Sequence, residues 1–291
     1  MRETFNIGKI EESVFKYIGL NIVNHKDHTA VSQDEFVKQI QPIPIATTRQ
    51  SQKTAKLTKE ELMELRSVVG QANWVASQTR PDICYDVLEL SMCLSRNPEV
   101  RHLLQANKMI RKMKSDSYAL IFPRMNDISN LQIEVYSDAS HANLPDGSSS
   151  TEGYVILLTV DDKSSVISWK SSKIKRVVRS STAAESLALS DALDDALYLR
   201  ELVTELLGLK LKIVAYIDNK NLHSLIHSTT SITEKRLRIE VAAVKEKMAR
   251  KEVSQIHWVQ TNNQLADSLT KRGVRCNKLI EVLAKGKTNQ L

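Results

Sequence analysis

The sequence predicts an α/β protein in which a mostly helical first part is followed by a part that combines five strands with helices. The first observation behind this prediction is a change of hydrophobic period at Leu131, from helical spacing to strand alternation. The second is the order of the later elements, which is three strands, a helix, a strand, helices, a strand and a helix. The third is composition, because 42% hydrophobic and 26% charged residues in a chain of 291 are typical of a globular protein with room for two domains.

The chain opens with a predicted hairpin and a short helix. Residues 15–23 alternate as a strand does, and residues 29–31 resume an extended path after a turn. Apolar side chains over residues 32–40 have helical spacing, and Pro42 and Pro44 end that helix.

A polar segment then leads into three helices. Residues 46–57 are polar and poor in large apolar groups, so we expect a mobile segment there. Thr58 and Glu61 match a capping box and predict the start of a helix that continues through Val75. The two further helices are predicted at 81–95 and 98–114.

Five strands are predicted from Leu131 onward. The first has Ile133 and Val135 alternating with polar neighbours and ends at Asp138. The second and third form a hairpin around the turn residues 161–164. The later strands are predicted at 153–160, 165–170, 213–217 and 253–259.

The helices of this second part follow from spacing and stop signals. A long helix is predicted over 182–207, and Gly208 ends it because glycine readily adopts the left-handed backbone of a helix C-terminus. The shorter helices are predicted at 222–227, 233–250 and 264–269.

Four acidic residues stand where predicted strands and helices end or begin, and these are Asp138, Glu185, Asp218 and Asp267. Converging carboxylates suit Mg²⁺, which prefers oxygen ligands, and a two-metal site stabilises both the attacking and the leaving oxygen of a phosphodiester. Each acid also has an ordinary structural explanation. Asp138 and Asp218 can be turn residues, Glu185 can complete a capping box with Thr182, and Asp267 can favour a helix dipole.

Basic side chains precede the helix that carries Glu185. The net charge of +7 and the pI near 9.2 favour a polyanionic partner only modestly. Residues 163–179 hold six cations and no acid, so we predict phosphate contacts there, with a solvated hairpin as the alternative. The predicted contacts are Lys173, Lys175, Arg176 and Arg179. The second basic cluster, attributed to a solvated helix face, consists of Lys108, Arg111, Lys112 and Lys114.

Cysteine spacing and hydropathy indicate the cellular compartment of the protein. Cys84, Cys93 and Cys276 have no C-x-x-C spacing, so we expect free thiols in a reducing compartment. No apolar run approaches the roughly 18 residues of a membrane span, and the first residues lack a signal-peptide core. We therefore expect a soluble intracellular protein without membrane association.

Seven short segments carry a family resemblance. Five of them, in chain order, are Tyr136–Ser140 (YSDAS), Ile167–Ser171 (ISWKS), Arg179–Glu185 (RSSTAAE), Tyr216–Asn219 (YIDN) and Gln264–Lys271 (QLADSLTK). These five resemble the ribonuclease H domain of copia-type retrotransposon polyproteins. Upstream, Phe15–Leu20 (FKYIGL) and Thr79–Ile83 (TRPDI) resemble the thumb and connection end of the reverse transcriptase in the same family.

The resemblance implies a ribonuclease H-like fold, which is a five-stranded mixed sheet with flanking helices, preceded by a mostly helical reverse transcriptase thumb/connection remnant. It divides the chain into that remnant at 1–129, a ribonuclease H-like domain at 130–272 and a basic C-terminal tail at 273–291. The family's polymerase palm, with its Tyr-x-Asp-Asp loop, has no counterpart, since the near match TVDD at 159–162 lies in the predicted hairpin turn. We therefore expect no DNA polymerisation from this chain alone, and a separate palm-containing reverse transcriptase chain as a partner.

The resemblance also implies a magnesium-dependent endonuclease that cuts the RNA strand of an RNA/DNA hybrid. Asp138 and Asp218 would share two Mg²⁺ ions, for which Mn²⁺ can substitute, with Glu185 on the second ion and Asp267 on the nucleophile side. RNA would be selected through its 2'-OH, which DNA lacks. The residues implied in that contact are Ser140, Asn143, Ser181 and Thr182. The expected location is the cytoplasm, with virus-like particles or the nucleus as alternatives.

Two other functions compete with an active nuclease. A non-catalytic remnant of a decayed or domesticated element would keep the fold and the basic residues and bind nucleic acid without turnover. An integrase-type nuclease would share the fold but place its acids in the order Asp, Asp, Glu. Here the glutamate comes second, which argues against an integrase.

Overall fold

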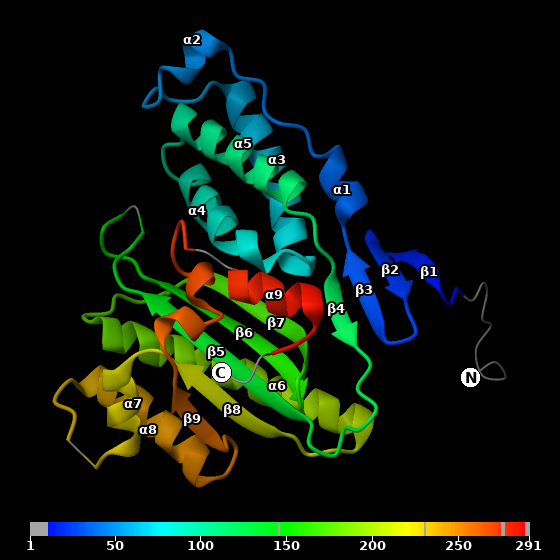
Figure 1. Ribbon diagram of the computed structural model, residues 1–291. Coiled ribbons are helices and arrows are strands. Elements are labelled where there is room, and N and C mark those ends of the chain that lie inside the picture. The colour runs from blue at the N-terminus through cyan, green and yellow to red at the C-terminus, as the bar shows by residue number, and fades with distance from the viewer. Residues whose placement is uncertain (1–10, 145, 230, 275–276, 289–291) are drawn as a thin grey trace.

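The computed structural model describes residues 11–144, 146–229, 231–274 and 277–288. Within these residues the strands form two sheets, one with the order β1-β2-β3-β4 and one with the order β7-β6-β5-β8-β9 (Figure 1). In the five-stranded sheet β5, β6 and β7 are antiparallel neighbours, whereas β8 runs parallel to β5 and β9 parallel to β8. The predicted α/β class with a five-stranded mixed sheet is confirmed.

The four-stranded sheet lies in the N-terminal part of the chain. Its strands are β1 (Val14–Tyr17), β2 (Leu20–Asn24), β3 (His28–Ser32) and β4 (Leu120–Pro123). The single strand predicted over 15–23 is wrong, because the chain turns back at Ile18 and Gly19, both of which have positive φ. Strand β4 was missed in the sequence because it gains its pairing with β3 from far along the chain.

The helices of the N-terminal part, except the shortest one, pack into one apolar core. Their bounds are α1 (Asp34–Gln39), α2 (Thr47–Gln50), α3 (Lys59–Gln78), α4 (Cys84–Leu94) and α5 (Val100–Ser115), with a 3-10 turn η1 (Pro81–Ile83) before α4. The predicted capping box of Thr58 and Glu61 is confirmed at the start of α3. The short helix α2 lies within the polar segment 46–57, where Arg49 pairs with Glu61 through two 2.8 Å bonds, and the mobility expected of this segment stays a prediction.

The predicted acids lie near one end of the strands of the five-stranded sheet. Its strands are β5 (Gln132–Ser140), β6 (Thr151–Val160), β7 (Lys163–Lys173), β8 (Lys212–Ile217) and β9 (Gln255–Trp258). Strand β5 does not end at Asp138 as predicted but continues to Ser140, because its register with β6 pairs Asp138 with Gly153. A Cβ on Gly153 would come within 2.8 Å of the Leu269 Cβ, so glycine at this position lets the segment after β9 lie against the strand that carries Asp138.

Helices cover both faces of this sheet (Figure 1). One face packs against α6 (Ser181–Leu207), with α7 (Lys220–His227) and α8 (Lys235–Ala249) beside it. Gly208 ends α6 in the left-handed conformation, as predicted. The other face packs against α9 (Asn277–Lys285) and against β4.

The C-terminal segments differ from the prediction. The helix expected at 264–269 is absent, and two 3-10 turns, η2 (Thr261–Asn263) and η3 (Asp267–Leu269), bracket the loop instead. The residues after 272 were expected to form a tail, yet α9 buries Leu279 and Leu283 against the sheet. Cys276 lies outside the described residues, and the proposed domain boundaries stay a prediction. No helix within the described ranges has the length and apolar character needed to cross a bilayer.

Candidate metal centre

Three carboxylates converge at one edge of the central sheet. Asp138 lies on β5, Glu185 on the first turns of α6, and Asp218 directly after β8. One oxygen from each lies within 4.8 Å of the others. Asp138 and Asp218 meet because β5 and β8 are parallel neighbours in register, with Tyr136 opposite Tyr216 two residues earlier. The expectation that these three acids converge is therefore met, while their chemical roles stay a prediction.

The start of α6 aims Glu185 at this cluster. Ser180 is the N-cap of α6, and its hydroxyl accepts a hydrogen bond from the Ala183 N–H. The capping box considered for Thr182 and Glu185 is therefore wrong. The Thr182 hydroxyl instead accepts a bond of 3.1 Å from the side chain of Asn221, and Glu185 is left to face the acids.

Two carboxyl oxygens of the cluster have no hydrogen-bond partner within the described part of the protein. Asp138 is 0% exposed and Glu185 6%, and neither Asp138 Oδ1 nor Glu185 Oε2 has a hydrogen-bond partner among the described residues. Burial raises the pKa of Asp138 to about 7, opposed by Lys271 and Thr270 and reinforced by Asp218. Burial, followed by the charges of Asp138 and Asp218, raises the pKa of Glu185 well above its usual value. Buried carboxylate oxygens without partners fit the oxygen ligand set that Mg²⁺ and Mn²⁺ prefer.

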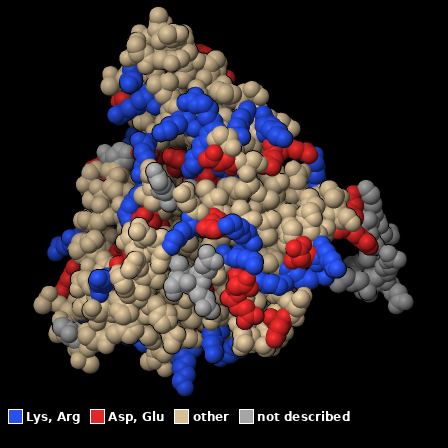
Figure 2. Space-filling model, in the orientation of Figure 1, with Lys and Arg blue, Asp and Glu red and all other residues tan. Residues whose placement is uncertain are grey.

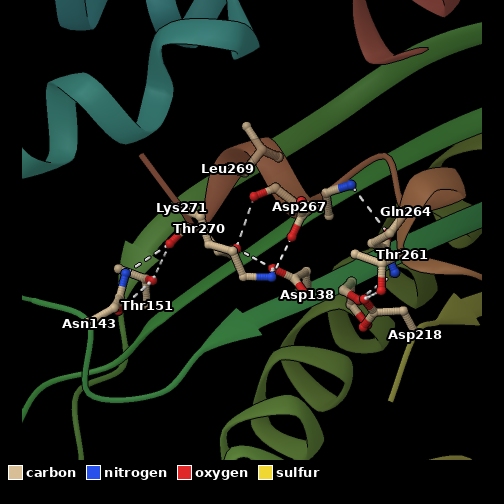
Figure 3. Close-up of polar contacts among 12 residues, drawn as sticks. Asp138, Asn143, Thr151, Asp218, Thr261, Gln264, Asp267, Leu269, Thr270 and Lys271 are labelled. Carbon is tan, nitrogen blue, oxygen red and sulfur yellow. Dashed lines mark hydrogen bonds and ion pairs between the residues drawn. The ribbon is translucent and has the colours of Figure 1, made fainter. Parts of the chain in front are cut away.

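Asp267, the fourth predicted acid, lies beside the cluster rather than in it. Its Oδ1 accepts from Nζ of Lys271, four residues later, and the same Nζ lies 3.5 Å from Asp138 Oδ2 (Figure 3). The Lys271 ammonium group therefore bridges two of the predicted ligands. The sequence analysis quoted Lys271 in the segment Gln264–Lys271 but gave it no role, and the ion pair joins it to Asp267 four residues earlier.

Hydrogen bonds from the segment after β9 orient the acids. Thr270 donates its hydroxyl hydrogen to Asp138 Oδ2, and Thr261 donates to Asp218 Oδ2 over 2.8 Å (Figure 3). The Gln264 amide donates to the backbone carbonyls of Ser137, at 3.0 Å, and Tyr216, at 3.3 Å, and so fastens the segment to β5 and β8. No sequence signal singled out these residues, because their partners are far away in the chain.

The residues predicted to contact the 2'-OH have different surroundings. Asn143 donates to the Tyr85 hydroxyl and to the Thr270 carbonyl, and it accepts from Thr151, so its side chain is occupied within the protein. Thr182 is buried. Ser140 is half-buried at the end of β5, and Ser181 is exposed at the start of α6.

The predicted phosphate-contacting cations divide into two pairs. Lys173 lies 3.4 Å from Asp146, and Arg176 pairs with Glu240. Lys175 and Arg179 are exposed, and neither has an ion-pair partner within the residues the structure describes. Half of the basic run is therefore already neutralised by the protein itself.

A second basic surface borders the centre. A cavity of about 990 Å³ lies between α4 and α5 on one side and residues 268–280 on the other. The cations that line it are Lys53, Arg96, Arg101, Lys108, Lys112, Lys271 and Arg272. Figure 2 shows Lys and Arg side chains around this hollow, with acidic side chains among them. Lys108 is exposed on α5, as expected of a solvated helix face, whereas Lys112 is half-buried and lies 3.5 Å from Asp82.

Comparison with known proteins gives several relatives and no matching family model. The chain is 33% identical over 211 residues to the retrovirus-related Pol polyprotein from transposon RE1 of Arabidopsis thaliana, covering 72% of this chain and 14% of that one. It is 31% identical to a transposon Ty5-1 protein of Saccharomyces cerevisiae, covering 64% of this chain and 61% of that one. Among solved structures, RNase H1 from Halobacterium salinarum aligns with 52% of this chain at 16% identity and a TM-score of 0.36. The chain thus spans only part of the length of these sequence relatives.

Proposed function

Because the chain belongs to the family of copia-type retrotransposon Pol polyproteins, we propose that it is a divalent-cation-dependent endonuclease that cuts the RNA strand of RNA/DNA hybrids. The observation that carries this proposal is the meeting of Asp138, Glu185 and Asp218, with two buried oxygens left unpartnered. An acidic cluster that served only the fold would be expected to have these oxygens satisfied by the protein.

Each acid has a role in this proposal. Asp138, Glu185 and Asp218 would hold the Mg²⁺ or Mn²⁺ ions, and Asp267 would add a further carboxylate beside them. Bound cations lower the pKa of water and neutralise charge on the leaving 3' oxygen. The hydroxyls of Thr270 and Thr261 fix the carboxylates of Asp138 and Asp218 in the orientation that this binding needs.

The substrate is bound mainly through its phosphates. The exposed cations Lys175 and Arg179 precede Glu185, and the lysines and arginines of the cleft border the centre from the other side. Phosphate contacts position a duplex, whereas discrimination of RNA from DNA needs a contact to the 2'-OH. Ser181 supplies that contact in this proposal, because it is the exposed hydroxyl closest in sequence to Glu185.

The test is incubation of the purified chain with an end-labelled RNA/DNA hybrid. We expect Mg²⁺ to give cleavage of the RNA strand with 5' phosphate and 3' hydroxyl ends, and EDTA to abolish it. Duplex DNA of the same sequence should stay intact. Asp138→Asn is the matched control, because it keeps the shape of the side chain and removes the charge. Cleavage that persists in the folded Asp138→Asn protein, or in EDTA, would contradict the assignment.

A non-catalytic nucleic-acid-binding protein is the second candidate. The observation in its favour is the pairing of Asp267 with Lys271, which leaves three acids rather than four facing one another. In that case the wild-type protein would bind the hybrid with salt-dependent affinity, and no RNA product would form at any Mg²⁺ or Mn²⁺ concentration.

We also propose that a palm-containing reverse transcriptase chain is a partner in the cytoplasm. Strand β1 is an edge strand of the four-stranded sheet, and the side chains of Val14 and Tyr17 on this strand and of Ile18 in the turn after it are exposed and apolar. Exposed apolar groups on an open edge favour contact with another chain. Replacing the three residues with Ser should abolish co-purification with a co-expressed palm fragment of a relative and leave hybrid cleavage unchanged.

A further inference from the structure

The Lys271 ammonium group lies where it competes with a cation for the acidic centre. It pairs with Asp267 and lies 3.5 Å from Asp138 Oδ2, while about a third of its side chain stays exposed (Figure 3). These two contacts place a cationic side chain among the acids of the proposed metal site.

We propose that Lys271 is an internal counter-ion that neutralises Asp138 and Asp267 in the metal-free protein and lowers the affinity of the centre for divalent cations. This inference rests on the metal site of the proposed function. A divalent cation that binds Asp138 must overcome repulsion from the nearby ammonium group or displace it. Charge repulsion at such distances is strong in a partly buried site, where water screens poorly.

Lys271 has room to leave when a cation arrives. Its side chain lines the cleft of about 990 Å³ between the helical part and the centre, so the ammonium group can swing into solvent-filled space. Asp267 would then be released from its ion pair and become free to face the other acids. In this way one side chain couples the position of the fourth acid to metal binding, and accounts for its absence from the three-acid cluster.

Lys170 provides a matched control on the same sheet. Its ammonium group also bridges two carboxylates, lying 3.2 Å from Glu152 and 3.4 Å from Asp191, and its side chain is as exposed as that of Lys271. Glu152 and Asp191 are not members of the three-acid cluster. Replacement of Lys170 therefore removes a comparable pair of ion contacts without changing the charge at the proposed metal site.

The experiment is titration of the full chain with Mg²⁺ by calorimetry, together with thermal unfolding in EDTA and in saturating Mg²⁺. Lys271→Met should bind Mg²⁺ roughly ten-fold more tightly than wild type, because a positive charge next to the ligands is gone. It should unfold at a lower temperature in EDTA, because two buried acids lose their partner, and regain stability in Mg²⁺. Lys271→Arg should behave as wild type, and Lys170→Met should be destabilised equally in both conditions with unchanged Mg²⁺ affinity.

Lys271→Gln keeps a hydrogen-bond donor for Asp267 and serves if the Met variant does not fold in EDTA. Unchanged or weaker Mg²⁺ binding in the charge-free variants would overturn the counter-ion role. That result would leave the nuclease proposal intact if the wild type still cuts the hybrid. Tighter binding in a protein that cuts no hybrid would instead support the counter-ion role and contradict the nuclease. A wild-type chain that binds no Mg²⁺ overturns both.

Discussion

Two aspartates in this molecule are equally buried and have opposite surroundings. Asp82, in the helical part, is 4% exposed, and Asp138, on the central sheet, is 0% exposed. Asp82 accepts two bonds from Arg80, at 2.8 and 2.9 Å, and a third from the Tyr118 hydroxyl at 2.7 Å. Asp138 keeps one oxygen without a partner among the described residues. One carboxylate is fully satisfied by the protein, and the other is not.

The pKa values follow from this difference. Burial acts to raise the pKa of Asp82, but its hydrogen bonds and charge attraction with Arg80 outweigh burial and lower the pKa. Burial raises the pKa of Asp138, and Lys271 only partly opposes the rise. Asp82 is therefore an acid whose charge the protein itself compensates, whereas Asp138 is a buried acid that its protein neighbours compensate only in part. Burial alone does not separate a structural acid from a functional one, and the number of satisfied oxygens does.

The comparison makes its strongest prediction for activity. Asp138→Asn should lower the rate of hybrid cleavage by more than about 10³-fold, because the loss of several kcal/mol of transition-state stabilisation corresponds to at least that factor. Its free energy of unfolding in EDTA should change by no more than about 1 kcal/mol, since a desolvated charge is replaced by a neutral group. Single-turnover cleavage and urea denaturation measure the two effects. A large loss of stability would show that Asp138, like Asp82, is a structural acid.

The reverse result is expected for Asp82. Asp82→Asn should lower the free energy of unfolding by about 3–5 kcal/mol, because it leaves the buried Arg80 charge without its partner. Hybrid cleavage per folded molecule should stay near that of the wild type. The double variant Arg80→Met/Asp82→Leu is the control, since removing both charges should restore most of the lost stability. Failure of the double variant to recover would mean that packing, not the unpaired charge, causes the loss.

The comparison of wild type with Asp82→Asn also predicts how the unfolding free energy depends on pH. The pKa of Asp82 in the folded protein is lowered from 3.8, so its contribution to stability is present above that pH and is lost as pH falls below it. The difference in unfolding free energy between wild type and Asp82→Asn should therefore shrink as the pH is lowered from 6 to about 2. Urea denaturation at a series of pH values measures it. A difference that stays constant would show that Asp82 is not charged in the folded state.

The sequence predicts the positions of the acids better than their partners. Strand alternation around Ile133 and Val135 predicts the strand that carries Asp138. Helical spacing and the stop at Gly208 predict the helix that carries Glu185. Both signals are local in the sequence. The partners Thr270, Gln264 and Lys271 meet the acids only because Gly153 lets the loop after β9 approach β5. That approach depends on pairing over more than a hundred residues, which no local period encodes. For the same reason β4 and the packing of α9 escaped prediction.

The distinction between satisfied and unsatisfied charges also applies to the basic run, with a smaller effect. Lys175 and Arg179 have no ion-pair partner among the described residues, whereas Lys173 and Arg176 lie against Asp146 and Glu240. A phosphate contact releases counter-ions only if the cation is not already neutralised within the protein. The double variant Lys175→Ala/Arg179→Ala should therefore reduce the slope of log affinity against log salt by roughly 1.4–1.8, at 0.7–0.9 per lost contact.

The matched double variant Lys173→Ala/Arg176→Ala should reduce that slope by less than half as much, because each of these cations must first leave its acid to reach a phosphate. Hybrid binding in Ca²⁺ over a salt series measures both variants, with duplex DNA as a second ligand. The preference for hybrid over DNA should change little in either variant, since phosphates are common to both ligands. Equal slopes for the two variants would show that the protein's own acids do not decide which cations bind the backbone. An unchanged slope in both double variants would show that the basic residues 163–179 form a solvated surface without phosphate contacts.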